Sequence, residues 1–304
     1  MADQLIRATA ADNGIRAVGV ITTQLTQEAR ERHGLSYVAT AALGRSMAGA
    51  LLLASSMKQP QARVTLRVKG NGPMKGLYVD AGLNGTVRGY VDDPTIELPE
   101  LPLNLEGKLD VGGAIGNLGY LNVIRDIGYG QPHSSTTELI SGEIGEDLTY
   151  YLATSEQTPS ALMLGVFVEK ESVEAAGGLL IQIMPKASID EALVSLLESR
   201  ISGLQSFSTL LRSGKTLPII FEELLGDLGL NIFPEVQPVR FYCPCTRDRV
   251  TAAIPLLGES DLADMISQQE TAEATCHFCN ETYYVDPMEL REILAQIRSG
   301  SLAS

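Results

Sequence analysis

The sequence predicts an α+β protein in three parts: an N-terminal domain of mixed, largely antiparallel sheet with helices, a helical middle linker, and a small C-terminal domain. Three observations predict this division. Strand-like runs separated by glycine- and asparagine-rich turns occupy residues 15–184, short apolar helical patterns broken by glycine and proline follow, and all four cysteines lie after residue 241. We expect domains at residues 1–187, 188–240 and 241–304.

The N-terminal domain is predicted from strands that alternate with turns. Helices are expected at residues 36–57, where small residues such as Ala39 and Gly44 allow close packing, and at residues 146–157. Short turns such as the one at Asn71 and Gly72 favour antiparallel pairing. The strands are expected at residues 15–22, 63–69, 76–80, 87–90 and 119–126, with a hairpin formed by 161–169 and 178–184.

The middle linker carries apolar clusters with the spacing of short helices. Leu193, Leu196 and Leu197 fall on one helical face, and further clusters lie around Leu210 and Phe221. Glycines and prolines divide the segment into pieces that are individually weak as helices. Because the segment is too apolar for a solvated linker, we expect it to pack against another part of the protein.

The charge and the N-terminal sequence exclude several classes of partner. The formal net charge is −14, whereas phosphate binding requires a basic surface, so we expect no nucleic-acid partner and no membrane partner. The N-terminus lacks a basic start followed by an apolar run, and the most apolar stretch, residues 47–54, is too short to span a bilayer. We therefore expect a cytoplasmic protein whose cysteines rest as thiols or metal thiolates.

The four cysteines form two close pairs, and no other cysteine exists in the chain. Cys243 and Cys245 flank a proline, and Cys276 and Cys279 follow after thirty residues. Two close pairs separated by a small subdomain fit tetrahedral coordination of one zinc ion by four thiolates. A unit of about sixty residues is small for an independent core, so a metal that staples it together is physically expected.

Several alternatives to a zinc-based switch remain open on spacing alone. The thiols could be buried and structural, or they could hold a zinc ion that never leaves, as in a static zinc ribbon of a binding or scaffold protein. The closeness of each pair favours a sensor, because each pair can oxidise locally and oxidised sulfur is a poor zinc ligand. His277 lies between the cysteines of the second pair, but four thiolates already fill a tetrahedral site.

Motifs for catalysis are missing, so we expect no enzyme. The run Ser213-Gly-Lys-Thr216 resembles the end of a phosphate-binding loop, but Thr209 stands where that loop requires glycine. The chain has three histidines, which leaves acid–base catalysis little support. A thiol oxidoreductase that uses Cys276 and Cys279 would need a thioredoxin-like βαβ context, which the sequence does not offer.

The chain resembles the 33 kDa chaperonin family, the redox-regulated heat-shock chaperones of bacteria, nearly from end to end. The most specific similarity lies in the cysteine-containing segments 241–250 and 276–280, which read Phe-Tyr-Cys-Pro-Cys-Thr-Arg-Asp-Arg-Val and Cys-His-Phe-Cys-Asn. Further similar features are Val68-Lys-Gly-Asn-Gly-Pro73 and Gly177-Gly-Leu-Leu-Ile-Gln182. All four cysteines of the family's pattern are present.

The resemblance implies a chaperone that oxidation switches on. The reduced protein would hold one zinc ion per chain through Cys243, Cys245, Cys276 and Cys279 and be inactive. Oxidants would form the disulfides Cys243–Cys245 and Cys276–Cys279, zinc would leave, and the C-terminal unit and the linker would unfold. The oxidised protein would form a homodimer and hold unfolded client proteins without ATP, under oxidative and heat stress.

Overall fold

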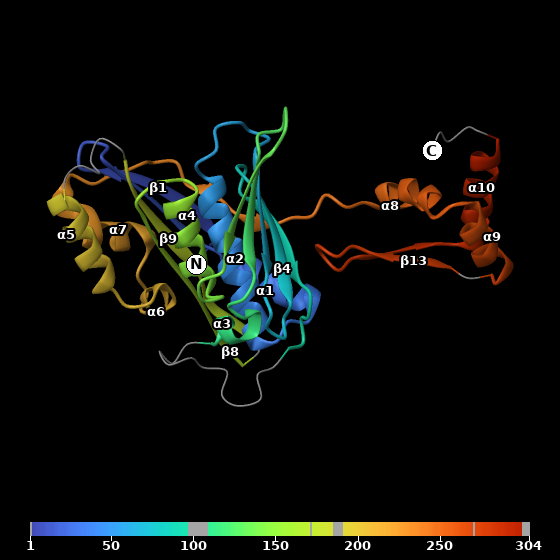
Figure 1. Ribbon diagram of the computed structural model, residues 1–304, viewed down its shortest axis with the longest axis horizontal. Coiled ribbons are helices and arrows are strands. Elements are labelled where there is room, and N and C mark those ends of the chain that lie inside the picture. Colours follow the sequence, from blue (N-terminus) through green and yellow to red (C-terminus); the bar gives the residue numbers. More distant parts are fainter. Residues whose placement is uncertain (1, 97–108, 171, 185–190, 270, 300–304) are drawn as a thin grey trace. The chain divides into compact units, whose positions relative to one another are not determined.

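The computed structural model describes residues 2–96, 109–170, 172–184, 191–269 and 271–299 (Figure 1). The chain divides into two compact units, Met1–Tyr242 and Cys243–Ser304. The expected boundary at residues 187 and 188 falls outside the described residues, and the three-part division stays a prediction.

Two six-stranded sheets form the larger unit. The first has the order β10-β1-β2-β9-β8, with β11 also paired to β1, and all its pairings are antiparallel. Its strands are β1 (Gln4–Ala10), β2 (Ile15–Ile21), β8 (Ser160–Glu169), β9 (Ser172–Ile183), β10 (Asn231–Ile232) and β11 (Gln237–Pro238). The predicted hairpin of residues 161–169 and 178–184 is confirmed as β8 and β9.

The second sheet has the order β12-β5-β4-β3-β6-β7. Its strands are β3 (Arg63–Lys69), β4 (Gly76–Gly82), β5 (Thr86–Val91), β6 (Tyr120–Asp126), β7 (His133–Glu138) and β12 (Arg240–Phe241). The four strands predicted between residues 63 and 126 are confirmed. Only β12 pairs in parallel, through Arg240 and Phe241 beside Thr86 and Val87.

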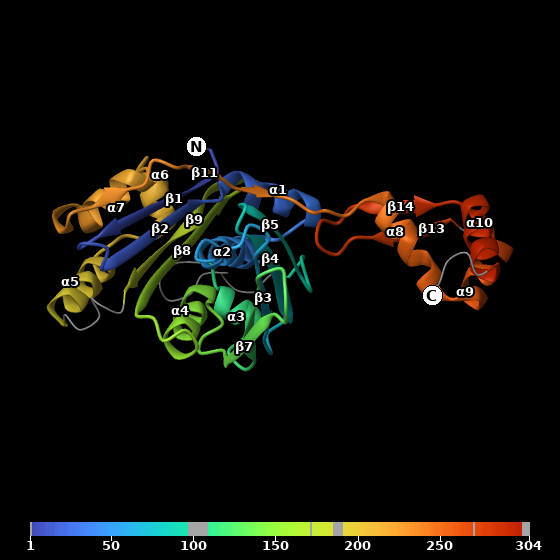
Figure 2. The same cartoon turned by 90° about the horizontal axis from the view of Figure 1, so that it is seen from above.

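Helix α2 (Tyr37–Ala54) packs against strands of both sheets and forms the centre of the unit (Figure 2). Its N-cap Ser36 accepts a hydrogen bond from the Ala39 amide, which is the signal expected at a helix start. Small residues let neighbouring elements approach α2 closely: a Cβ at Gly49 would lie 2.6 Å from the side chain of Leu148, which belongs to a neighbouring helix (Ile144–Thr154). Although α2 is long and apolar enough to cross a membrane, 94% of it is buried inside the protein, which is the environment of a core helix.

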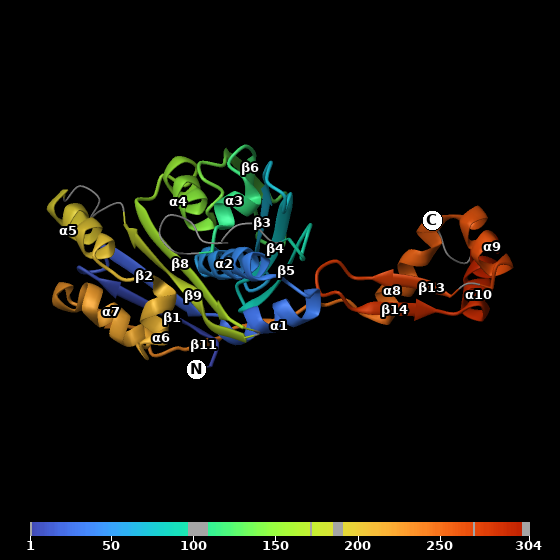
Figure 3. The same ribbon diagram turned by 90° about the horizontal axis from the view of Figure 1, so that it is seen from below.

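Three further helices complete this part of the unit. They are α1 (Thr23–His33), α3 (Val111–Ile115) and α4 (Ile144–Thr154), the last of which confirms the helix predicted at residues 146–157. Helices α2, α3 and α4 lie together beside the second sheet (Figure 3). Strands β1 and β7 and helix α1 are absent from the prediction.

The middle segment packs on one face of the first sheet, as its apolar composition predicts. It contains α5 (Glu191–Ser202), α6 (Phe207–Arg212), α7 (Leu217–Leu225) and the 3-10 turn η1 (Gly226–Leu228). The segment is not wholly helical, because β10, β11 and β12 extend along the edges of the two sheets. Glycines in the sheet make room for the helices: a Cβ at Gly19 would lie 2.7 Å from Leu217.

The C-terminal unit consists of short elements around a small core. They are α8 (Arg247–Ala253), η2 (Ile254–Leu257), α9 (Glu259–Ser267), the hairpin of β13 (Ala272–Thr275) and β14 (Thr282–Val285), and α10 (Pro287–Arg298). Asp286 caps α10 by accepting hydrogen bonds from the amides of Met288 and Glu289. The buried core comprises Ile254, Leu262, Ala272, Val285, Leu290, Ile293 and Leu294.

Candidate functional site

The two cysteine pairs meet in the C-terminal unit. All four Sγ atoms lie within 4.8 Å of one another. The sulfurs of Cys243 and Cys276 are 3.8 Å apart, and those of Cys245 and Cys279 are 3.2 Å apart. A zinc–sulfur distance of about 2.3 Å places the corners of a tetrahedron about 3.8 Å apart, so the four sulfurs are grouped as one metal ion would require. The four cysteines can hold a metal ion.

Local backbone structure presents each pair to the other. The second pair sits in the tight turn between β13 and β14, where the Cys276 amide donates to the Glu281 carbonyl over 2.9 Å and the Asn280 amide donates to the Cys276 carbonyl over 2.7 Å. Asn280 has φ of 58°, a left-handed conformation that asparagine tolerates. The first pair precedes α8, whose start is set by Thr246 accepting a hydrogen bond from the Arg249 amide.

The environment of the sulfurs opposes their ionisation unless a cation is present. Burial raises the pKa of the Cys279 thiol and also that of Cys276, although backbone amides that face each sulfur act in the opposite direction. Cys279 is buried, with 3% of its surface exposed, and the other three cysteines are partly buried. A divalent cation reverses this balance, because it stabilises the thiolates that it binds. The site as folded therefore suits a bound cation.

A tyrosine contacts the cluster and is missing from the prediction. The Tyr283 hydroxyl donates a hydrogen bond to the Cys245 Sγ over 3.2 Å, and this bond raises the pKa of Tyr283. Tyr283 lies in β14, opposite Ala274 of β13. The available signal was its position four residues after Cys279, in a strand that returns from the turn holding that cysteine.

An ion pair ties the elements around the cluster together. The Arg247 guanidinium at the start of α8 bonds to the Glu289 carboxylate on α10, with one contact at 3.1 Å, and to the Tyr284 carbonyl over 3.3 Å. Both side chains are partly or fully exposed, so solvent screening weakens this pair. Seven buried apolar residues form the core of the unit, which leaves much of its stability to the cysteine cluster.

Other residues considered from the sequence do not join the site. His277 is not part of the four-residue group, which agrees with the expected ligand set of four thiolates. The Lys215 ammonium binds the Glu223 carboxylate over 2.6 Å in the turn before α7, so it is already neutralised where a phosphate loop would need it. The run from Ser213 to Thr216 therefore forms the connection between α6 and α7 and does not form a phosphate-binding loop.

The second feature of interest is the apolar layer, defined here as helices α5, α6 and α7 on the first sheet. Phe207, Ile220 and Phe221 are 1% exposed or less, and they share a core cluster with β1, β2 and β9. The Arg200 guanidinium on α5 binds the Leu224 carbonyl over 2.6 Å and the Asp227 carboxylate over 2.7 Å. The apolar layer thus hides a large apolar surface.

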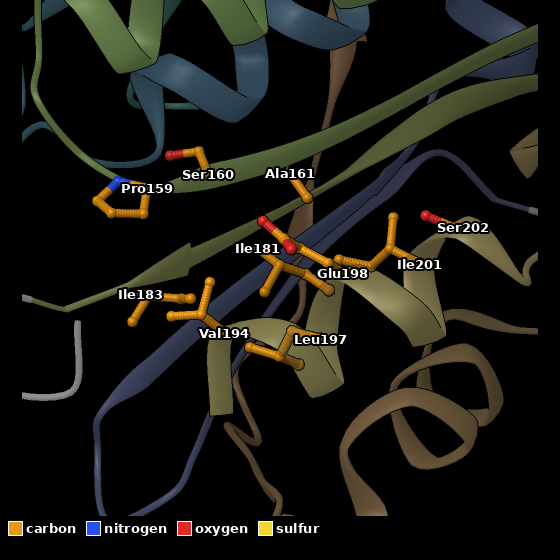
Figure 4. A pocket seen from close by; sticks show the side chains of 10 residues that line it. All are labelled: Pro159, Ser160, Ala161, Ile181, Ile183, Val194, Leu197, Glu198, Ile201 and Ser202. Atoms are coloured by element: carbon orange, nitrogen blue, oxygen red, sulfur yellow. The ribbon is translucent and has the colours of Figure 1, made fainter. Parts of the chain in front are cut away.

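The apolar layer is incompletely packed beneath α5. A cavity of about 200 Å³ lies there, and Figure 4 shows Val194 and Leu197 of the helix facing Ile181 and Ile183 of β9 across it. Its lining is mostly apolar, with the Glu198 carboxylate as its charged group. Among its described residues α5 buries Leu197, whereas α7 buries five side chains, so α5 is the less firmly held part of the apolar layer.

Comparisons with known proteins give the family. The chain matches the family model described as Hsp33 protein over residues 3–286. It is 65% identical over 304 residues to the 33 kDa chaperonin of Rippkaea orientalis, covering all of both chains, and 64% identical over 298 residues to that of Synechocystis sp., covering 98% of each. A crystal structure of the 33 kDa chaperonin from Thermotoga maritima matches with a TM-score of 0.91 at 36% identity, covering 98% of this chain and 100% of that chain.

The resemblance seen in the cysteine segments is confirmed by these matches, which extend over nearly the whole chain. The relatives are named chaperonins, and the names indicate no catalytic activity. A chaperone function, with four clustered cysteines that can bind a metal, is consistent with every feature described above. The chain belongs to the Hsp33 family, the 33 kDa chaperonins.

Proposed function

We propose that this protein is a cytoplasmic, ATP-independent holdase whose activity is switched on by oxidation of a zinc site. Reduced protein binds one zinc ion through Cys243, Cys245, Cys276 and Cys279 and keeps its apolar layer closed. The observation that carries the proposal is the grouping of four sulfurs at tetrahedral spacing in a unit with a seven-residue core.

Zinc is the metal that best fits the donor set. Four thiolates are soft ligands, which favour zinc over calcium and magnesium because those ions take oxygen ligands. Bound zinc keeps the thiolates ionised in a setting that otherwise raises their pKa. Because the metal binds the folded unit, its binding free energy adds to the stability of that unit.

Oxidation removes the metal by consuming its ligands. Each hydrogen peroxide molecule takes two electrons from a pair of thiolates, takes up two protons, and leaves one disulfide and two water molecules. The proposed disulfides are Cys243–Cys245 and Cys276–Cys279, and forming both requires two equivalents of peroxide. A disulfide sulfur is a poor ligand, so zinc leaves and the C-terminal unit loses the interaction that its small core depends on.

Chain continuity offers a route from the zinc site to the apolar layer. Strand β12 ends at Phe241, two residues before Cys243. The amides of Arg240 and of the next residue after the strand, Tyr242, donate to the carbonyls of Gly85 and Val87. We infer that unfolding after Cys243 removes β12 first and then β11 and β10, which connect it to α7. Release of α5, α6 and α7 exposes the apolar surface that they share with the first sheet. This surface binds unfolded clients with little directional preference. Homodimerisation of the oxidised chain is part of the proposal by family resemblance.

The test compares reduced and peroxide-treated protein in an assay of client aggregation at raised temperature, without ATP. The proposal predicts suppression of aggregation by the oxidised protein and little by the reduced protein. Equal suppression in both states would remove the redox switch. A static zinc ribbon instead predicts that zinc stays bound after mild peroxide, which a chromogenic chelator detects directly.

A further inference from the structure

Hydrogen-bond donors surround the cysteine sulfurs, but they come from two different sources. The backbone amides of Phe278 and Cys279 donate to the Cys276 sulfur, and that of Glu281 donates to the Cys279 sulfur. Cys245 instead receives a side-chain donor, the Tyr283 hydroxyl, at 3.2 Å. We propose that Tyr283 is a positioning residue that sets the reactivity of Cys245 and its affinity for the metal.

The backbone on either side of Cys245 explains why a side chain is needed. Pro244 separates the first two cysteines and has no N–H group, so this segment has one amide donor fewer than the turn that holds Cys276 and Cys279. The hydroxyl of Tyr283 supplies a donor from outside the segment. Since Tyr283 belongs to β14, the same bond also fixes the first cysteine pair against the hairpin that carries the second.

The chemistry follows from the charge of the site. Four thiolates around one divalent cation carry a net charge of −2, and donors that point at the sulfurs spread that charge. A thiolate that accepts a strong hydrogen bond has less electron density to offer an oxidant, because nucleophilicity falls as the anion is stabilised. Removing the hydroxyl would therefore make the Cys245 sulfur more reactive than it is in the unmodified protein and would loosen its orientation toward the metal.

Strand alternation provides a matched control. Tyr284 is the next residue in β14, its side chain points to the opposite face, and it is 57% exposed. Tyr283→Phe removes the hydroxyl that bonds to Cys245, whereas Tyr284→Phe removes one that faces solvent. Both changes keep the aromatic ring, so neither disturbs the small core that contains Val285.

The experiment uses full-length reduced protein loaded with zinc. Y283F is expected to lower zinc affinity about tenfold in chelator competition, the low end of the effect for residues that support metal ligands. It is also expected to move Cys245 earlier in the order in which iodoacetamide modifies the four cysteines, as read by peptide mass spectrometry. Y284F should match the unmodified protein in both measurements. Equal zinc affinity and equal order of modification in Y283F and wild type would overturn the inference.

A second variant separates a chemical role from a merely structural one. Site-specific 3-fluorotyrosine at position 283 keeps the shape of the side chain but makes its hydroxyl a stronger donor. Slower modification of Cys245 than in wild type is expected, and an unchanged rate would contradict the proposal. The inference rests on the proposed zinc site. Wild-type protein that binds no zinc would defeat that proposal itself, whereas zinc-binding wild type with an unaltered Y283F would defeat the inference alone.

Discussion

The apolar layer and the C-terminal unit are both built from short helices, yet they are held in place by different forces. Helices α6 and α7 bury Phe207, Ile220 and Phe221 against a sheet, as part of a cluster of nineteen buried residues. The C-terminal unit buries seven apolar residues and adds four grouped sulfurs. Oxidants do not weaken the packing of buried aliphatic side chains, but they react with thiolates.

This difference indicates where a chemical signal can act. Under the proposed function, an oxidant acts on the thiolates of the C-terminal unit and not on the buried side chains of α7. In the proposed mechanism, the short strands β10, β11 and β12 transmit unfolding of the C-terminal unit to the apolar layer. Because the proposed sensor and the proposed client-binding surface lie in different parts of the sequence, each can be altered by mutation without the other.

The largest effect is expected from losing one metal ligand. Cys279→Ser should abolish tight zinc binding because it removes one of the four proposed ligands. The effect on the unit should be large, because structural zinc contributes on the order of 10 kcal/mol to the folding of small units. The C-terminal unit should then be loose even in reductant, as seen by circular dichroism and proteolysis. His277→Gln is the matched control and should retain zinc. Normal zinc content in the Cys279 variant would contradict four-thiolate ligation.

The pH should act in opposite directions on the metal-bound and metal-free unit. Zinc displaces protons from thiols, so its apparent affinity should fall about tenfold per pH unit for each proton displaced as pH decreases. In the metal-free protein, burial raises the pKa values of Cys276 and Cys279 above the ordinary value of 9.0. The folded fraction that the metal-free unit retains should therefore be largest below pH 9 and should decrease as pH rises further. Chelator competition and urea unfolding across pH measure the two trends, and parallel trends would contradict this description.

Weakening the apolar layer should bypass the sensor. Phe221→Ala deletes a fully buried ring and should cost about 3–5 kcal/mol, which opens α7 without oxidation. The reduced variant is expected to suppress client aggregation. Ile219→Ala, on the same helix but 46% exposed, should stay inactive when reduced. An inactive Phe221 variant whose layer is nevertheless cut by protease would show that clients bind elsewhere.

The smallest effect is expected at the cap of the last helix. Asp286→Ala removes the acceptor for the Met288 and Glu289 amides and should destabilise the C-terminal unit by about 1 kcal/mol. Zinc should then leave at a lower peroxide dose, while the apolar layer of the reduced protein stays closed. The exposed Glu292→Ala on the same helix serves as control. An unchanged peroxide threshold would mean that α10 does not support the zinc site.

The elements that the sequence predicts correctly are those in which apolar residues recur with the period of a strand or a helix, or which begin with a clear cap. Strand β3 alternates buried and partly buried residues throughout, and α2 follows a clear N-cap. By contrast, β7 reads His-Ser-Ser-Thr-Thr-Glu and lacks apolar residues, because it is an edge strand whose side chains face water. Strand β1 contains two alanines, a residue that is depleted in strands, and α1 buries only Leu25, Thr26 and Ala29.

The candidate site was more predictable than the strands around it. Cysteine is rare, and metal geometry restricts the spacing of cysteine ligands. The sequence alone therefore predicts that Cys243 and Cys279 lie close together, without any knowledge of the fold. Tyr283 could not, because a tyrosine in a strand is ordinary and its contact with Cys245 depends on the register of a hairpin. At the start of α10, Asp286 caps the helix and the Glu289 carboxylate binds Arg247.

The most direct measurement counts zinc, free thiols and client binding in one sample during peroxide titration. Reduced protein should contain one zinc ion and four thiols per chain and leave a denaturing client to aggregate. Two equivalents of peroxide should remove all four thiols and the zinc ion together, and client suppression should appear over the same range. Thiol loss with zinc retained, or suppression that precedes zinc release, would contradict the proposed switch.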